Sequence, residues 1–234
     1  MAVILYLDTM LVPLSLFLTI GYHAYLWHSF KNKPTLTTIG MHALRRRVWL
    51  QGMEQGDDKK GMLAVQSLRN ALMATILSAT VAIFITVSLA AVANNTYNAS
   101  HLFNRRFFGL QSGKILVLKY GSASLFLLVS FLCSSMSLGC LIDANFLINA
   151  ASGTHHHDHS SSSSSSSSCP GPGYTQTILE RGFMLAVVGN RVLCITFPLL
   201  LWMFGPVPVA VSSVALIWRL YELDFAARFT KCLT

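Results

Sequence analysis

The side chains of this sequence that could do chemistry are polar groups near the ends of long apolar stretches. If the N-terminus lies outside the membrane, nine of them fall at the cytosolic ends of four predicted helices: His23, Gln66, Arg69, Asn70, Asp143, Asn145, Asn149, Asn190 and Arg191. Tyr22 and His28 fall at the same depth. Such groups are costly in lipid and usually face the interior of a bundle or a water-filled cavity.

Two interpretations of this candidate polar cluster stay open. In the functional one it lines a cytosol-facing vestibule, where Arg69 or Arg191 is available to an anion. In the structural one the same groups satisfy one another, for example Arg69 with Asp143, and lock the helices together. Gln66, Arg69 and Asn70 share one helix face at 100° per residue, and we expect that face to be turned inward. A second, outer set is expected to pair in the same manner: Asp8, Lys119, Arg219, Glu222 and Asp224.

Motifs for other chemistries are absent from the predicted spans. They contain no His-rich metal box, no Asp pair and no nucleophile elbow, so we expect no enzyme, catalytic residue, cofactor or metal site. The five cysteines have no spacing that predicts a disulfide framework or a zinc site. The net charge of +8 comes with no nucleic-acid-binding motif, so no nucleic-acid partner is expected.

The hydropathy of the sequence predicts the helices that must position these polar residues. The chain has 234 residues, of which 53% are hydrophobic and only 11% charged. Four stretches, at about 9–27, 71–93, 115–138 and 192–218, are apolar enough to cross a bilayer, for which roughly 20 residues suffice. The last is long and contains Gly205-Pro206-Val207-Pro208, which predicts a kink or break. We therefore predict an all-α integral membrane protein with four transmembrane helices and short interfacial helices.

Charge fixes the expected orientation. Between Lys31 and Arg69 eight cations oppose three acids, whereas two N-x-[ST] sequons, at Asn94 and Asn98, follow the second span. The positive-inside rule then places the N-terminus outside the cytosol, in the plasma membrane or an endomembrane. With four spans both termini share that side, and the sequons could make the protein a glycoprotein.

The basic first loop predicts one partner, anionic lipid headgroups. Apolar residues recur at helical spacing around Arg45, Arg46 and Arg47, which is typical of a helix lying on the inner leaflet. A solvated charged loop is the alternative.

The whole chain, 1–234, is expected to form one four-span domain. Within it, 154–173 contains His155, His156, His157 and His159 followed by nine consecutive serines. This composition predicts a disordered linker, although the histidines could bind a metal ion adventitiously.

The second span carries small residues every fourth position: Ala74, Ser78, Ala82, Thr86 and Ala90. Small side chains let helices approach closely in lipid. This ladder and the basic loop favour a membrane scaffold or accessory subunit, and they are compatible with a homo-oligomer. The inner polar cluster and the broken last span favour the alternative, a small transporter or channel-like component.

Several phrases occur together and in order: YLDTMLVPLSLFLTIGYHAYLW, LAVQSLRNALMA, NFLIN, GFMLAVVGNR and FPLLLWMFGPV. They resemble a plant membrane-protein family known only as a domain of unknown function, family 599. The resemblance covers nearly the whole chain, and the serine-rich linker departs from it as a local insertion. It implies a multi-span helical membrane protein. It brings no established activity, so no catalytic residues are carried over.

Overall fold

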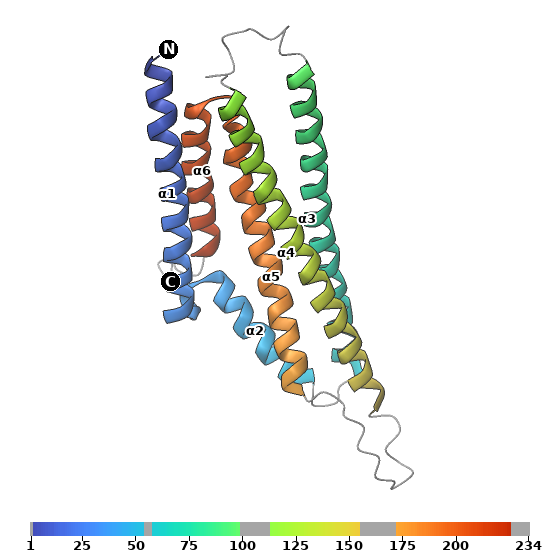
Figure 1. Cartoon of the computed structure of the whole chain (residues 1–234). Helices are drawn as coiled ribbons and strands as arrows, with labels where there is room; N and C mark the ends of the chain where they lie inside the picture. The colour runs from blue at the N-terminus through green and yellow to red at the C-terminus, as the bar shows by residue number, and fades with distance from the viewer. Residues whose placement is uncertain (1, 54–57, 99–112, 155–171, 226–234) are drawn as a thin grey trace. The chain divides into compact units, whose positions relative to one another are not determined.

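The computed structural model of the chain describes residues 2–53, 58–98, 113–154 and 172–225, and within this part it contains helices and no strand (Figure 1). The elements are α1 (Ala2–Asn32), the short 3-10 helix η1 (Pro34–Leu36), α2 (Thr38–Met53), α3 (Asp58–Asn98), α4 (Gly113–Thr154), α5 (Pro172–Leu201) and α6 (Pro206–Asp224). The predicted linker core at 155–171, the sequon residue Ser100 and the side chain of Asp8 lie outside the described residues.

Among the described residues, four helices are long and apolar enough to cross a membrane: Met10–Asn32, Met62–Asn95, Val117–Asn149 and Gly173–Leu201. The prediction of an all-α integral membrane protein with four such helices is confirmed. The fourth helix, however, is not where the sequence predicted it. α5 runs without interruption through Gly189-Asn190-Arg191, which we had expected to precede the span, and it ends at Leu201.

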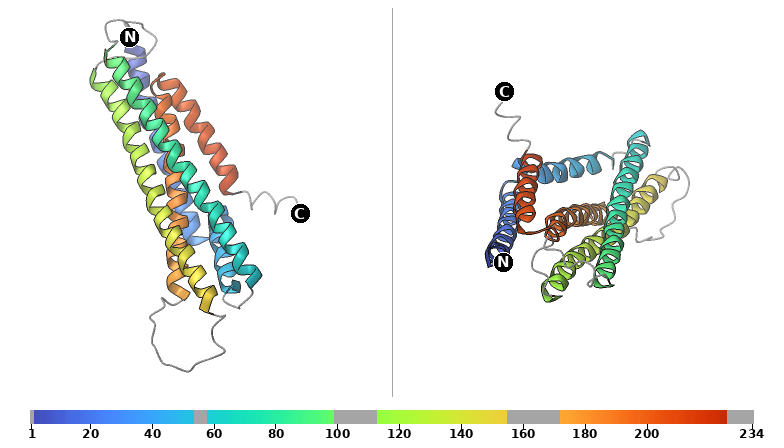
Figure 2. Two further views of the ribbon diagram at one scale, coloured as in Figure 1. Left: turned by 90° about the vertical axis from the view of Figure 1, so that its right-hand side faces the viewer. Right: turned by 90° about the horizontal axis from the view of Figure 1, so that it is seen from above.

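The predicted break at Gly205-Pro206 is confirmed, but it separates two helices instead of kinking one. Residues 202–204 form a turn, and Gly205 has a φ of 136°, a left-handed value that favours glycine. Pro206 then opens α6, where its missing N–H leaves no helical hydrogen bond unmade. α6 runs beside α1 and in the same direction (Figures 1 and 2). Its 19 residues reach roughly 28 Å.

The end of α6 therefore lies at the end of α1 where α2 begins. The hydroxyl of Thr38, the first residue of α2, donates to the backbone oxygens of Leu223 and Asp224. Asp224 is thus at the opposite end of α1 from the N-terminus. The expectation that both termini share a side counted 192–218 as one helix, whereas the structure has two helices in this region, α5 and α6.

The chain divides into two compact units, and the division cuts through the long helices. Unit 1 comprises Met1–His42, Ala82–Val129 and Arg191–Thr234, and unit 2 comprises Ala43–Val81 and Ser130–Asn190. Each has its own apolar core. In unit 1 the buried cluster is Tyr22, Leu26, Leu220 and Phe225. In unit 2 it is Leu50, Leu68, Leu141, Ala144, Ile148 and Leu179.

Unit 2 also contains a close contact between α4 and α5. Ser130 donates to the carbonyl of Gly189 at 2.8 Å, and Ser137 donates to that of Gly182 at 2.7 Å. The two serines are seven residues, or two helical turns, apart on α4, and the two glycines are equally far apart on α5. Their order along the chain is opposite, because the two helices are antiparallel. The glycines allow this approach, since a Cβ at Gly189 would lie 2.9 Å from the Ser134 Oγ. This explains why a Gly-Asn pair is tolerated inside α5.

Candidate functional site: a polar network joining α1, α5 and α6

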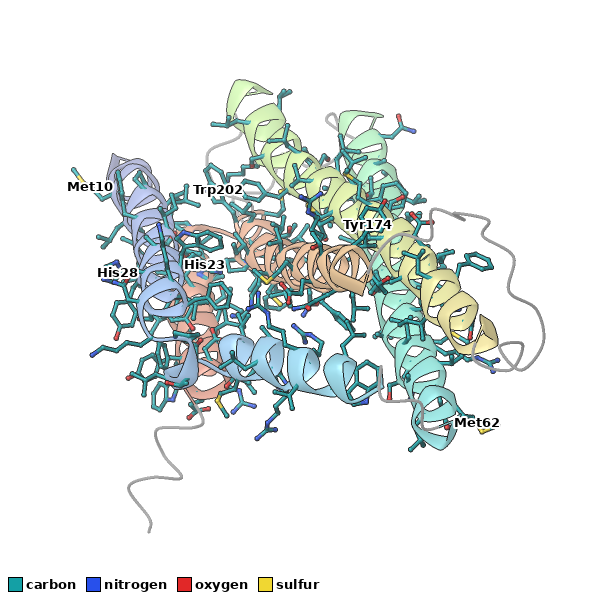
Figure 3. The ribbon with its side chains drawn as sticks, turned by 90° about the horizontal axis from the view of Figure 1, so that it is seen from below. Met10, His23, His28, Met62, Tyr174 and Trp202 are labelled. Carbon is teal, nitrogen blue, oxygen red and sulfur yellow. The ribbon has the colours of Figure 1, made fainter. Side chains whose placement is uncertain are left out.

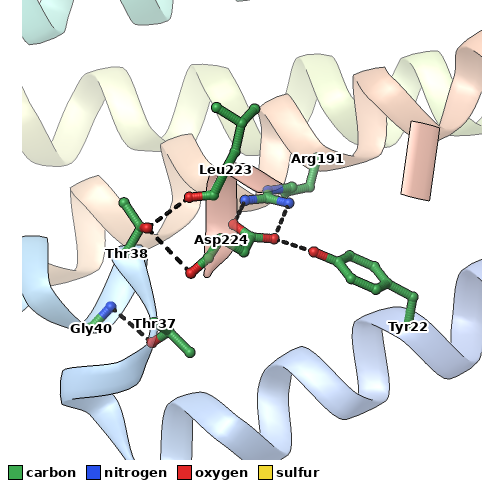
Figure 4. A network of polar contacts seen from close by, with 7 residues as sticks. All are labelled: Tyr22, Thr37, Thr38, Gly40, Arg191, Leu223 and Asp224. Carbon is green, nitrogen blue, oxygen red and sulfur yellow. Dashed lines mark hydrogen bonds and ion pairs between the residues drawn. The ribbon is translucent and has the colours of Figure 1, made fainter. Parts of the chain in front are cut away.

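The site is built around the buried carboxylate of Asp224, at the last residue of α6 (Figure 4). Arg191 of α5 donates through Nη1 to Oδ2 at 2.8 Å and through Nη2 to Oδ1. The hydroxyl of Tyr22, on α1, donates to Oδ2 at 2.5 Å. The Asp224 side chain is 2% exposed and that of Arg191 is 17% exposed. Three helices thus meet in one bidentate ion pair reinforced by a phenol.

The position of Asp224 on its helix makes these partners necessary. A carboxylate at a helix C-terminus faces the negative end of the helix dipole, which is unfavourable. The Arg191 guanidinium supplies the opposite charge. The Thr38 hydroxyl binds the terminal backbone oxygens of Leu223 at 2.7 Å and of Asp224 at 3.2 Å.

The local sequence explains why Thr38 lies beside the end of α6. Pro34 opens η1 directly after α1, because proline fits the first turn of a helix. Thr37 then caps α2: its Oγ1 accepts the N–H of Gly40 at 3.3 Å, as an N-cap hydroxyl does. Any side chain at Gly40 would collide with the backbone, since a Cβ there would lie 2.2 Å from the Pro34 oxygen.

His23 lies next to this network. Figure 3 shows it on the side of α1 that faces the neighbouring helices, whereas His28 points away. Its ring packs edge-on against Tyr22 at 5.3 Å, and its Nδ1 is 2.8 Å from the backbone oxygen of Thr19. A carbonyl only accepts, so Nδ1 carries the proton. The Nε2 atom is buried and has no hydrogen-bond partner among the described residues.

The candidate polar cluster is divided between the two units. His23 and Arg191 belong to unit 1, and the remaining members belong to unit 2: Gln66, Arg69, Asn70, Asp143, Asn145, Asn149 and Asn190. That all nine form one site stays a prediction.

Within unit 2 the expected inward face is wrong. Gln66, Arg69 and Asn70 are all exposed, while α3 buries Ala64 and Leu68 instead.

The expected partner of Arg69 is not found either. Asp143 is exposed, and the structure records no hydrogen bond or ion pair between these two described side chains. Asn149 and Asn190 are also exposed, and the Oδ1 of Asn145 is buried without a partner among the described residues. Unit 2 therefore does not assemble these residues into a network.

The outer set pairs differently from the prediction. Lys119 is 4% exposed, and its Nζ donates to the backbone oxygen of Trp202 at 3.1 Å, with the indole ring 5.4 Å away. Arg219 and Glu222 form an exposed pair one turn apart on α6. Asp224 instead binds Tyr22 and Arg191, a correction that follows from the reversal of the chain at Gly205-Pro206.

Sequence reasoning also missed a polar contact between α2 and α5 in unit 2. Arg47 donates to both carboxylate oxygens of Glu180, at 2.5 and 3.0 Å, and Gln176 donates to the same carboxylate at 3.0 Å. The adjacent Arg46 lies over the Phe183 ring, 4.3 Å from its centroid. Glu180 is the one acid of α5, opposite a run of three arginines, and this was the available signal.

Four apolar helices that could cross a membrane, with their buried polar groups bonded to one another, are typical of one class of protein. The chain is a multi-pass helical membrane protein. A family profile described as "Protein of unknown function, DUF599" matches residues 10–229. The chain belongs to this family, as the resemblance of its sequence phrases implied. Neither the curated proteins nor the solved structures contain a match to the chain.

Proposed function

We propose that the protein is a non-catalytic scaffold or accessory subunit of a membrane complex. The observation that carries the proposal is the use made of buried charge in unit 1. Lys119 binds the Trp202 backbone, and Arg191 and Asp224 bind each other. Ionisable groups in membrane spans that serve transport line a path or a wet cavity. Here they join helices of the same chain.

The outer surface of α3 supports the same proposal. Leu77 and Phe84 are 64% and 69% exposed, whereas Leu68 and Ala82 are buried. The small residues that recur at every fourth position of this helix are also accessible, except Ala82. Ala74, Thr86 and Ala90 are exposed, and Ser78 is half-buried. Small side chains beside large apolar ones allow a transmembrane helix of another protein to pack closely.

Site-specific photo-crosslinking in native membranes tests the proposal. A photoreactive residue at Leu77 or Phe84 is expected to yield one discrete adduct with another protein, and the same residue at Leu68 is the buried control. An adduct of twice the chain mass indicates a homo-oligomer instead. Smears of equal intensity from exposed and buried positions contradict a defined docking face.

One observation favours the alternative, a small transporter or channel-like component. The unpartnered Nε2 of His23 lies beside Tyr22, which binds the Asp224 carboxylate, so protonatable groups adjoin one another within the membrane. The purified protein in sealed vesicles should leave proton and ion permeability unchanged if it is a scaffold. A flux that Asp224→Asn abolishes establishes the transporter instead.

A further inference from the structure

In unit 2, α2 packs at the edge of the apolar part of the membrane spans. Its Leu50 belongs to one buried cluster with Leu68 of α3 and Leu141 of α4. Arg69 is the last charged residue before the apolar stretch of α3, and Asp143 is the first one after that of α4. Charged side chains are costly in the hydrocarbon core. The packing of α2 therefore places it where that core ends and the headgroup layer begins.

The course of the chain ties α2 to one surface of the membrane. The chain leaves the first candidate span at Asn32 and enters the second at Met62, and α2 occupies Thr38–Met53 between them. Two consecutive spans are joined on one side of a bilayer. Both ends of α2 are therefore held close to the same surface.

One face of α2 is turned to the protein and the other is turned away from it. Arg46 lies on the packed face, with its guanidinium 4.3 Å from the centroid of the Phe183 ring. At 100° per residue, Leu44 and Val48 lie on the opposite side of the helix. They are one turn apart and are 36% and 70% exposed. The outward face of α2 therefore has an apolar centre.

Arginines border this apolar pair on both sides. At 100° per residue, Arg45 flanks Leu44 and Val48 on one side and Arg47 flanks them on the other. Arg47 is bound to Glu180. Arg45 is exposed, and the structure records no ion pair between it and another described residue, so its charge is not compensated. Exposed apolar residues bordered by arginines are typical of a helix that lies in the interfacial layer of a bilayer.

We propose that the outward face of α2 is a docking surface for the anionic lipid leaflet on this side of the membrane. Leu44 and Val48 enter the boundary between headgroups and acyl chains, and Arg45 binds the negative charge of the headgroups. Arg46 and Leu50 hold the opposite face on the protein, so that α2 is fixed between protein and lipid. This inference does not depend on the scaffold proposal, since a transporter could carry the same surface.

Fluorescence quenching by brominated lipid tests the docking. A fluorescent amino acid is placed at Val48 of the full-length protein, which is reconstituted in vesicles of phosphatidylcholine with brominated acyl chains. The same amino acid at His42, exposed on the other side of α2, is the matched control. We expect the Val48 probe to lose most of its fluorescence and the His42 probe to keep it.

Three results would overturn the docking. Equal quenching at Val48 and His42 means that α2 has no lipid-facing side. An absence of quenching at Val48, with the probe open to aqueous iodide, means that the face is turned to water. A Val48 probe protected from both bromine and iodide means that a second copy of the chain covers the face, and the lipid assignment is then wrong.

The charge of Arg45 is tested with the same probe at Val48, by comparing brominated phosphatidylserine with brominated phosphatidylcholine as quencher. We expect phosphatidylserine to be preferred about fivefold, the contribution of one basic residue near an anionic surface. Arg45→Gln should remove this preference. Arg46→Gln, which changes the packed face, is the matched control and should retain it. No preference in the parent, or an equal loss in both variants, contradicts the role of Arg45.

Discussion

Tyr22 and Asp224 are 202 positions apart in the chain, yet the phenol of one donates a 2.5 Å hydrogen bond to the carboxylate of the other. This contact brings the last residue of α6 to the half of α1 that leads into α2. With Arg191 it forms the polar centre of unit 1, surrounded by Leu26, Leu220 and other apolar side chains.

Tyr22→Phe removes one donor from a buried carboxylate and leaves the ring packing in place. A hydrogen bond to a charged group contributes about 1.5–3 kcal/mol, and we expect a loss of that size in the free energy of unfolding in detergent micelles. Tyr25→Phe is the matched control, because Tyr25 is 46% exposed, and its unfolding should be unchanged. Equal effects in the two variants would contradict a specific role for the Tyr22 hydroxyl.

Lys119→Met keeps the length of the side chain and removes its charge. The Trp202 carbonyl then loses a cationic donor near the C-terminal end of α5, where positive charge is favourable. We expect a loss of about 1–3 kcal/mol in the free energy of unfolding and faster amide exchange in the 202–205 turn. Arg219→Met breaks an exposed pair and should cost less than about 1 kcal/mol.

Gly189→Ala places a methyl group against α4, 2.9 Å from the Ser134 Oγ and 3.2 Å from the Ser130 backbone oxygen. The two helices must separate, and overpacking of this kind costs about 1–3 kcal/mol. Gly139→Ala provides the contrast, since a Cβ there meets nothing within 4 Å. Alanine is the better helix former, so Gly139→Ala should be neutral or stabilising. Thermal unfolding of both variants decides whether the close α4–α5 contact exists.

The course of α6 predicts that the two termini face opposite sides of the membrane. α6 runs in the same direction as α1 and ends beside Thr38, at the start of α2. With the N-terminus outside the cytosol, a C-terminal tag should be digested by protease added to the cytosolic face, and an N-terminal tag should be protected. Protection of both tags contradicts this course of the chain.

Much of this fold could be predicted from hydropathy alone, because a stretch such as 71–93 has to be a membrane helix whatever it packs against. The break at Gly205-Pro206 was also visible. The sequence did not reveal that one helix runs from Pro172 to Leu201, because Gly189 is a poor helix former and its contact with the serines of α4 is seen only in the structure. Local propensity yielded there to a tertiary contact.

The candidate site was predicted only in part. Tyr22 and Arg191 were expected in one group, and the structure joins both to Asp224, which was expected in the other group because α5 and α6 were taken as one helix. Gln66, Arg69 and Asn70 do share a face, as helical periodicity requires. Periodicity does not say which way that face points, and the structure exposes it.

The central claim is that Arg191 and Asp224 form a structural lock between α5 and α6, and a double-mutant cycle measures it most directly. Arg191→Leu strands a buried carboxylate, and we expect it to lower the free energy of unfolding in micelles by about 3–5 kcal/mol. Adding Asp224→Leu removes the stranded charge and should recover much of that loss, so that the two effects are strongly non-additive. If the single effects simply add, or if Arg191→Leu leaves stability intact and abolishes a stabilisation by added anion, the pair is no lock and Arg191 serves a ligand.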